Sequence, residues 1–190
     1  MILCLLGMLS ISVYLAISIS TFGIPPSISD TFYLWDSKRK YLGLLFTAAL
    51  FAVTFFVTPY WIEITPAELR FLPFLGGGAL SFVGVASHFL DPDEKPFHYG
   101  SAFLWAGASI AWMIVTGVWY AILPPLLFCG AAWLMSARQN TTFWGEVTVV
   151  LALLIALVRT MSVGEKRRAA TLSAVLKITH PPQRRTNVRS

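Results

Sequence analysis

Residues 1–22 of the chain read MILCLLGMLSISVYLAISISTF and include no Asp, Glu, Lys or Arg. A helix of about 20 apolar residues is long enough to cross the hydrocarbon core of a bilayer, which is ~30 Å thick. A cleavable signal peptide has basic residues first, a shorter apolar run and a cleavage site of small residues. Residues 1–22 lack this arrangement, so they predict a retained transmembrane helix.

The composition extends this prediction to most of the chain. Of the 190 residues, 56% are hydrophobic and 12% are charged, whereas an average soluble domain has about 25% charged residues. Five further apolar blocks follow, and Tyr or Trp residues flank several of them, as is typical of helix ends at the membrane–water interface. We therefore predict an all-α fold, a polytopic transmembrane bundle of about six helices, at residues 1–22, 41–61, 71–89, 97–120, 121–137 and 143–161.

The bundle over residues 1–161 is followed by a basic tail, residues 162–190. From Glu165 onward the tail has seven Lys or Arg residues and one Glu. Such a segment is suited to the anionic head groups of a lipid leaflet. Nucleic-acid binding is not expected, because basic content alone is unspecific. With six helices both termini share one face, which holds nine of the 14 Lys and Arg residues, so we predict cytoplasmic termini and a cytoplasmic tail.

The connections after the first, third and fifth helices share the opposite face, where most of the unusual polar residues gather. In the first connection, Ser27 and Asp30 have the spacing of a helix-capping box. This spacing predicts a short interfacial helix that leads into the second transmembrane helix; a re-entrant, substrate-facing loop is the alternative.

Two histidines flank the third connection of this bundle. His88 closes the third helix and His98 opens the fourth, with Asp91 in the acidic turn between them. Imidazole and carboxylate groups are suitable ligands for zinc, so His88, Asp91 and His98 form a candidate metal site. In the alternative interpretation the turn is solvated and each histidine bonds to its own helix end.

A stripe of small and polar residues follows the fourth helix from His98 through Ser101, Trp105 and Ser109, and Ser81 extends it onto the third helix. This spacing places the residues on one side of a helix. Close helix packing explains such a stripe; the alternative is a cavity lined by these residues. The glycines at 76–78 have no phosphate-loop context and are expected to permit close packing or a bend.

Glu146 lies a few residues into the last transmembrane helix. Ionisable groups within a bilayer are functional candidates by default, although a carboxylate in the first helical turn is also stabilised by the helix dipole. Ser81 and Glu146 are therefore the candidate catalytic residues. The two cysteines, Cys4 and Cys129, predict no disulfide framework, and no cofactor-binding motif is present in the sequence.

Residues 25–33 (PPSISDTFY), 82–86 (FVGVA) and 98–102 (HYGSA) resemble those of uncharacterised multi-pass membrane proteins of Bacteroidota and their phages. This resemblance implies a bacterial inner membrane location.

A serine in one helix followed by His, Asp and His is more remotely similar to the alkaline ceramidase and adiponectin-receptor superfamily. That similarity implies a zinc-dependent intramembrane amide hydrolase, but the superfamily also has a His-x-x-x-His pair in its last helix, where this chain has no histidine.

The function expected from the sequence is that of a non-enzymatic integral membrane protein. It binds a lipid or small ligand, or it is a subunit of a homo- or hetero-oligomeric membrane assembly. The alternatives are a metal-dependent intramembrane hydrolase with a His/Asp site at one face, and a small transporter. No inverted repeat or mid-membrane charge supports the transporter.

Overall fold

The computed structural model describes residues 2–86, 90–136 and 139–179, with the backbone alone for residues 163–179. Within these ranges the chain is helical and has no strand, which confirms the predicted all-α class. The α-helices are α1 (Ile2–Phe22), α2 (Thr31–Lys38), α3 (Leu44–Ile64), α4 (Phe71–Val85), α5 (Lys95–Val115), α6 (Leu123–Met135) and α7 (Thr141–Thr179), with short 3₁₀ turns η1 (Ala67–Leu69) and η2 (Trp119–Ile122).

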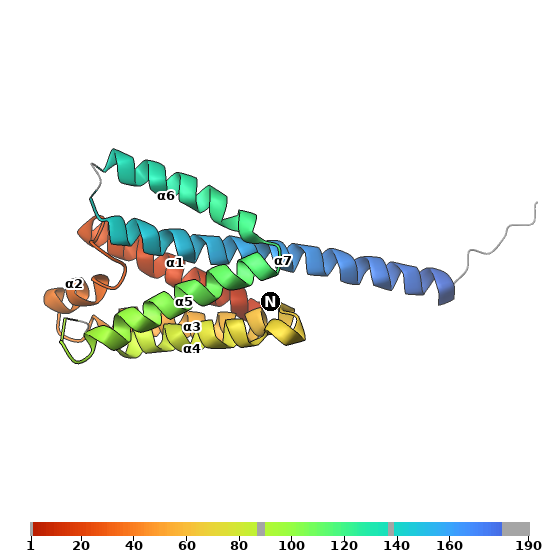
Figure 1. Cartoon of the computed structure of the whole chain (residues 1–190), viewed down its shortest axis with the longest axis horizontal. Coiled ribbons are helices and arrows are strands. Elements are labelled where there is room, and N and C mark those ends of the chain that lie inside the picture. The colour runs from red at the N-terminus through yellow and green to blue at the C-terminus, as the bar shows by residue number, and fades with distance from the viewer. Residues whose placement is uncertain (1, 87–89, 137–138, 180–190) are drawn as a thin grey trace, which may run out of the picture. The chain divides into compact units, whose positions relative to one another are not determined.

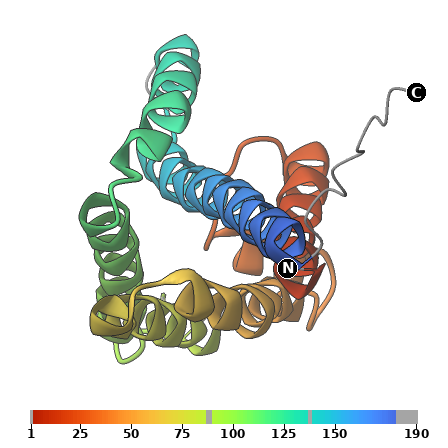
Figure 2. The same ribbon diagram turned by 90° about the vertical axis from the view of Figure 1, so that its right-hand side faces the viewer.

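The chain divides into two compact units, Met1–Leu157 and Val158–Ser190. In the first unit α1 packs against α3, α3 against α4, and α4 against α5 (Figure 1). These neighbours are antiparallel, and the view along the bundle in Figure 2 shows α6 at its edge. The connections on either side of α2 and the connection from α4 to α5 therefore lie at one end of the bundle, while η1 and η2 lie at the other (Figure 1).

Four helical segments are long and apolar enough to cross a membrane, at Ile2–Phe22, Leu44–Ile64, Ala67–Val85 and Thr141–Ser162. Their large apolar side chains are widely exposed, as expected where lipid rather than water surrounds a helix. These segments make the chain a membrane protein. The helix α5 is equally long but more polar, and α6 has only 13 residues.

Several helix boundaries differ from the sequence prediction: the helix predicted to reach residue 89 ends at Val85, and the larger differences are at the ends of α5 and α7. The helix expected to reach Tyr120 ends at Val115, because Gly117 adopts φ +76°, a left-handed conformation that ends the helix. The last helix continues past its expected end at residue 161 as far as Thr179, so the first part of the predicted tail is helical.

Two clusters of buried side chains form the core of the first unit. The cluster nearer η1 and η2 is centred on Trp61 and Trp112, whose rings meet edge to face with centroids 5.5 Å apart. The cluster nearer α2 includes Phe32, Phe46 and Phe143. Because Phe32 of α2 is one of the buried side chains of this cluster, α2 is part of the packed core.

Close packing of α3 on α4 depends on the predicted glycine run. A Cβ atom built on Gly77 would lie 2.4 Å from the Thr58 side chain, well inside van der Waals contact. Gly76 faces the ring of Trp61, whereas Gly78 faces open space. The first two glycines thus allow the helices to approach, as the sequence predicted.

Candidate functional site

The three polar connections at the α2 end of the bundle meet as predicted. The Leu90 N–H donates to the Tyr33 hydroxyl at 2.9 Å, which joins the α4–α5 connection to α2. The Asn140 side-chain amide donates to the Ile24 carbonyl at 3.1 Å, which joins the segment before α7 to the one after α1. Partial burial raises the pKa of Tyr33, so its phenol stays neutral and keeps its hydrogen.

The predicted capping pair forms the turn that precedes α2. The Ser27 hydroxyl accepts the Asp30 N–H at 3.0 Å and donates to the Asp30 carboxylate at 2.8 Å. The bond from Thr31 N–H to the Ile28 carbonyl then begins the turn into the helix. The two side chains bond to each other and a short helix follows, but the pair closes the turn before α2, whose N-cap residue, Asp30, makes no side-chain capping bond. Residues 27–29 of this connection are buried.

His98 joins this connection to α4 and α5. It lies in the first turn of α5 and is 2% exposed. Its Nδ1 lies 2.8 Å from the Ala86 carbonyl, which can only accept, so Nδ1 carries the hydrogen. In the neutral imidazole Nε2 then accepts the Ser29 hydroxyl hydrogen, at 3.0 Å. His98 therefore connects the end of α4 to the buried segment before α2.

Glu146 joins the same segment to α7. Its carboxylate accepts the backbone N–H of Ile28, and one turn earlier the Phe143 N–H donates to the Pro26 carbonyl at 3.1 Å. An irregular segment has no helical partners for its backbone groups, and where the segment is buried these groups must bond to its neighbours. Glu146 supplies one of those partners.

The last helix to hold the segment is α1. The Tyr14 and Thr31 hydroxyls bond to each other, and Thr31 also donates to the Ile28 carbonyl. The Trp35 indole N–H donates to the Ser18 hydroxyl at 2.9 Å. Residues from α1, α5 and α7 thus converge on residues 24–31, which we call the anchored connection.

Two of the three predicted metal ligands, Asp91 and His98, lie in the described part of the chain. Asp91 is exposed and its carboxylate accepts the Asp93 N–H at 3.0 Å. Both ring nitrogens of His98 already have protein partners, while His88 lies outside the described residues. Across the described part of the chain, no group of three or more His, Cys, Asp and Glu residues could hold a metal ion.

The predicted catalytic serine and cavity residues are mostly bonded within their own helices. The Ser81 hydroxyl donates to the Gly77 carbonyl at 3.2 Å, and the Ser109 hydroxyl to the Trp105 carbonyl at 2.8 Å. The Trp105 side chain packs against both core clusters, and Ser101 is half-buried. Both hydroxyls bond to a carbonyl of their own helix, and neither bond crosses a helix contact.

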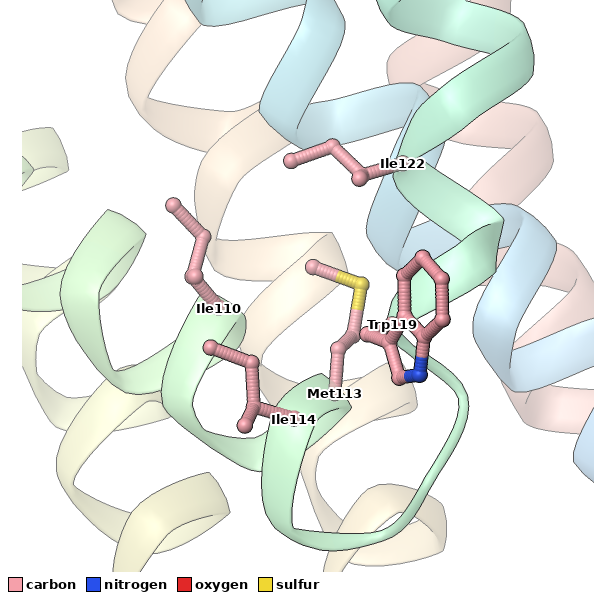
Figure 3. Close-up of a pocket in the computed structure, with 5 residues that line it drawn as sticks. All are labelled: Ile110, Met113, Ile114, Trp119 and Ile122. Atoms are coloured by element: carbon pink, nitrogen blue, oxygen red, sulfur yellow. The ribbon is translucent and has the colours of Figure 1, made fainter.

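Sequence reasoning missed a second feature, an apolar recess of about 270 Å³ at the other end of α5. Figure 3 shows its five lining side chains, which come from α5 and η2. Met113 is 1% exposed and forms the floor, whereas Ile114 and Trp119 are 59% and 54% exposed and form the rim. Ile110 and Ile122 complete the lining. In the sequence these residues are indistinguishable from ordinary lipid-facing ones.

No protein-family model, curated protein or solved structure matches this chain. The site must therefore be interpreted from its own geometry.

Proposed function

We propose that this protein is a non-enzymatic integral membrane protein that binds the hydrocarbon part of a lipid in the apolar recess. The single observation that carries the proposal is the recess itself, whose five lining side chains are all apolar or aromatic. The polar residues of the anchored connection bond to one another and to backbone groups, so they already have partners without a ligand.

The size of the recess favours a hydrocarbon chain. Pockets for drug-sized ligands typically occupy about 300–1,000 Å³, and the recess is smaller and open on one side. It can take a segment of one acyl chain. Trp119 stands at the rim beside Tyr120, and such aromatic residues favour the level of the lipid head groups. An acyl chain that descends from this level meets Met113 at the floor.

Photolabelling tests this proposal. The purified protein is reconstituted with a phospholipid that carries a diazirine on one acyl chain, and the labelled residues are mapped by mass spectrometry. We expect label on the recess residues, and Ile122→Trp should reduce it to background by filling the space. The matched control is Leu127→Trp on α6, where the side chain is 74% exposed and outside the recess. Equal labelling of all exposed apolar faces would contradict the proposal.

We further propose that α5 and the η2–α6 segment cross the membrane with the four longer helices, in the bacterial inner membrane, with both termini cytoplasmic. The antiparallel order of the helices supports six crossings.

Thiol labelling tests the orientation. Ser37→Cys on α2 and Glu68→Cys on η1 place exposed thiols at opposite ends of the bundle. An impermeant maleimide added to cells with a permeable outer membrane should label Ser37→Cys only. Selective labelling of Glu68→Cys would reverse the orientation.

The Ser29–His98 pair favours a second candidate function, acyl transfer by a serine nucleophile. A hydroxyl bonded to an imidazole that a third group orients is the arrangement of such sites. Here the Ala86 carbonyl orients the ring. A fluorophosphonate probe tests this candidate. If the probe labels the wild-type protein covalently and Ser29→Ala abolishes the labelling, the candidate is supported. If the folded wild-type protein is not labelled, the candidate is rejected. Zinc analysis of the same sample tests the metal-dependent alternative.

A further inference from the structure

Three successive cations extend from the end of α2: Lys38, Arg39 and Lys40. All three side chains are exposed, and none forms an ion pair with another described residue. The nearest carboxylate in sequence, Asp36, is occupied, because it accepts the Tyr41 N–H at 2.7 Å. None of the three positive charges, which we call the α2 basic patch, is therefore paired directly with a carboxylate in the described part of the chain.

Two aromatic rings, one at the end of α1 and one in α2, hold one of these cations in place. The Lys38 ammonium lies 5.6 Å from the Phe22 ring centroid and 6.0 Å from that of Trp35, within the range of cation–π attraction. The two rings meet edge to face at 5.0 Å, and the Trp35 indole is bonded to Ser18 of α1. This attachment limits the positions that the Lys38 side chain adopts.

Lys40 has a similar partner. Its ammonium lies 5.1 Å from the Tyr41 ring centroid. Tyr41 adopts φ +74° and is fixed there by the Asp36 cap. A cation on each side of Arg39 is thus paired with an aromatic ring rather than with a carboxylate.

The patch lies at the membrane boundary. The first span ends at Phe22 and the next begins at Leu44; the α2 basic patch lies between them, at the same end of the bundle. Aromatic and basic side chains at this depth meet lipid head groups. A soluble acidic protein is less well matched, since three charges beside exposed rings offer only a small contact area.

We propose that the α2 basic patch binds the phosphate head group of an anionic phospholipid. Arg39 can bond two phosphate oxygens with its planar guanidinium group, and the ring-held lysines flank it. This site is independent of the apolar recess, which lies at the opposite end of the bundle, and the inference holds for either membrane orientation.

The test compares lipid retention by the full-length protein in nanodiscs of phosphatidylglycerol and phosphatidylcholine in equal amounts. Native mass spectrometry after detergent extraction gives the ratio of the two lipids that stay bound. The variant Lys38→Gln/Arg39→Gln/Lys40→Gln removes the charges from exposed positions and keeps the C-terminal tail. The matched control is Lys95→Gln, an exposed cation at the same end of the bundle.

Each basic residue near a membrane surface strengthens binding of anionic lipid by about fivefold. After screening by salt, we expect the triple variant to lower the phosphatidylglycerol preference by about tenfold. The Lys95→Gln control and millimolar inorganic phosphate should leave that preference unchanged. If the folded triple variant, or the milder Lys38→Gln, retains the full preference, the proposal is wrong. Competition by inorganic phosphate would also overturn it, since it would indicate a site for a soluble anion.

Discussion

Replacing His98 with Ala tests whether the anchored connection stabilises the bundle. The substitution removes an imidazole that is 2% exposed and both of its described hydrogen bonds. It leaves the Ala86 carbonyl and the Ser29 hydroxyl buried without this partner. Hydrogen bonds between membrane helices contribute about 0.6 kcal/mol on average and up to about 1.7 kcal/mol, whereas a buried group left unpaired costs about 1–3 kcal/mol.

The two lost bonds and the small cavity together predict a loss of about 2–4 kcal/mol in the free energy of unfolding. Reversible unfolding in mixed detergent and SDS micelles, followed by circular dichroism, measures this difference. The matched control is Phe97→Ala, one residue earlier in the same turn, where the side chain is 69% exposed. Because lipid or detergent surrounds that ring in both states, we expect a loss of at most about 0.5 kcal/mol.

A double-mutant cycle isolates the bond between His98 and Ser29. We expect a coupling energy of about 0.6–1.7 kcal/mol between His98→Ala and Ser29→Ala. A loss below about 0.5 kcal/mol for His98→Ala, or additive effects of the two substitutions, would refute the reasoning that this pair anchors the connection.

Two further predictions follow from the packing and the polar contacts. Gly77→Ala places a methyl group against the stiff side chain of Thr58, so it should lower the free energy of unfolding by about 1–3 kcal/mol. The control is Gly78→Ala at a position that faces open space, which should be neutral or stabilising in the same unfolding assay. Glu146→Ala leaves the Ile28 N–H without its described partner, so we expect the free energy of unfolding to fall by about 1–3 kcal/mol. Glu146→Gln should recover most of this loss, because the amide oxygen can still accept the bond. Equal losses in the two variants would contradict this role.

The sequence was sufficient for those features that depend on local pattern. The apolar blocks predicted the helices, the spacing of Ser27 and Asp30 predicted the bonded turn before α2, and the chain order of the helices predicted which connections meet. The partners of individual polar groups were not predictable in this way. His98 bonds to Ser29 from 69 positions away, and only the approach of the first turn of α5 to the segment before α2 brings the two together. The apolar recess was equally hidden, because residues that line a recess and residues that face lipid have the same composition.

Two residues of the candidate reactive site, His98 and Glu146, have a common physical task in the structure. A buried irregular segment must find partners for its backbone N–H and C=O groups within the protein. In the anchored connection, Glu146 accepts the N–H of Ile28, and side chains or backbone from other helices bond the carbonyls of Ile24 and Pro26. Glu146 and His98 therefore each bond a backbone group at this buried connection, the Ile28 N–H and the Ala86 carbonyl. The apolar recess has no comparable structural explanation, which is why we assign ligand binding there.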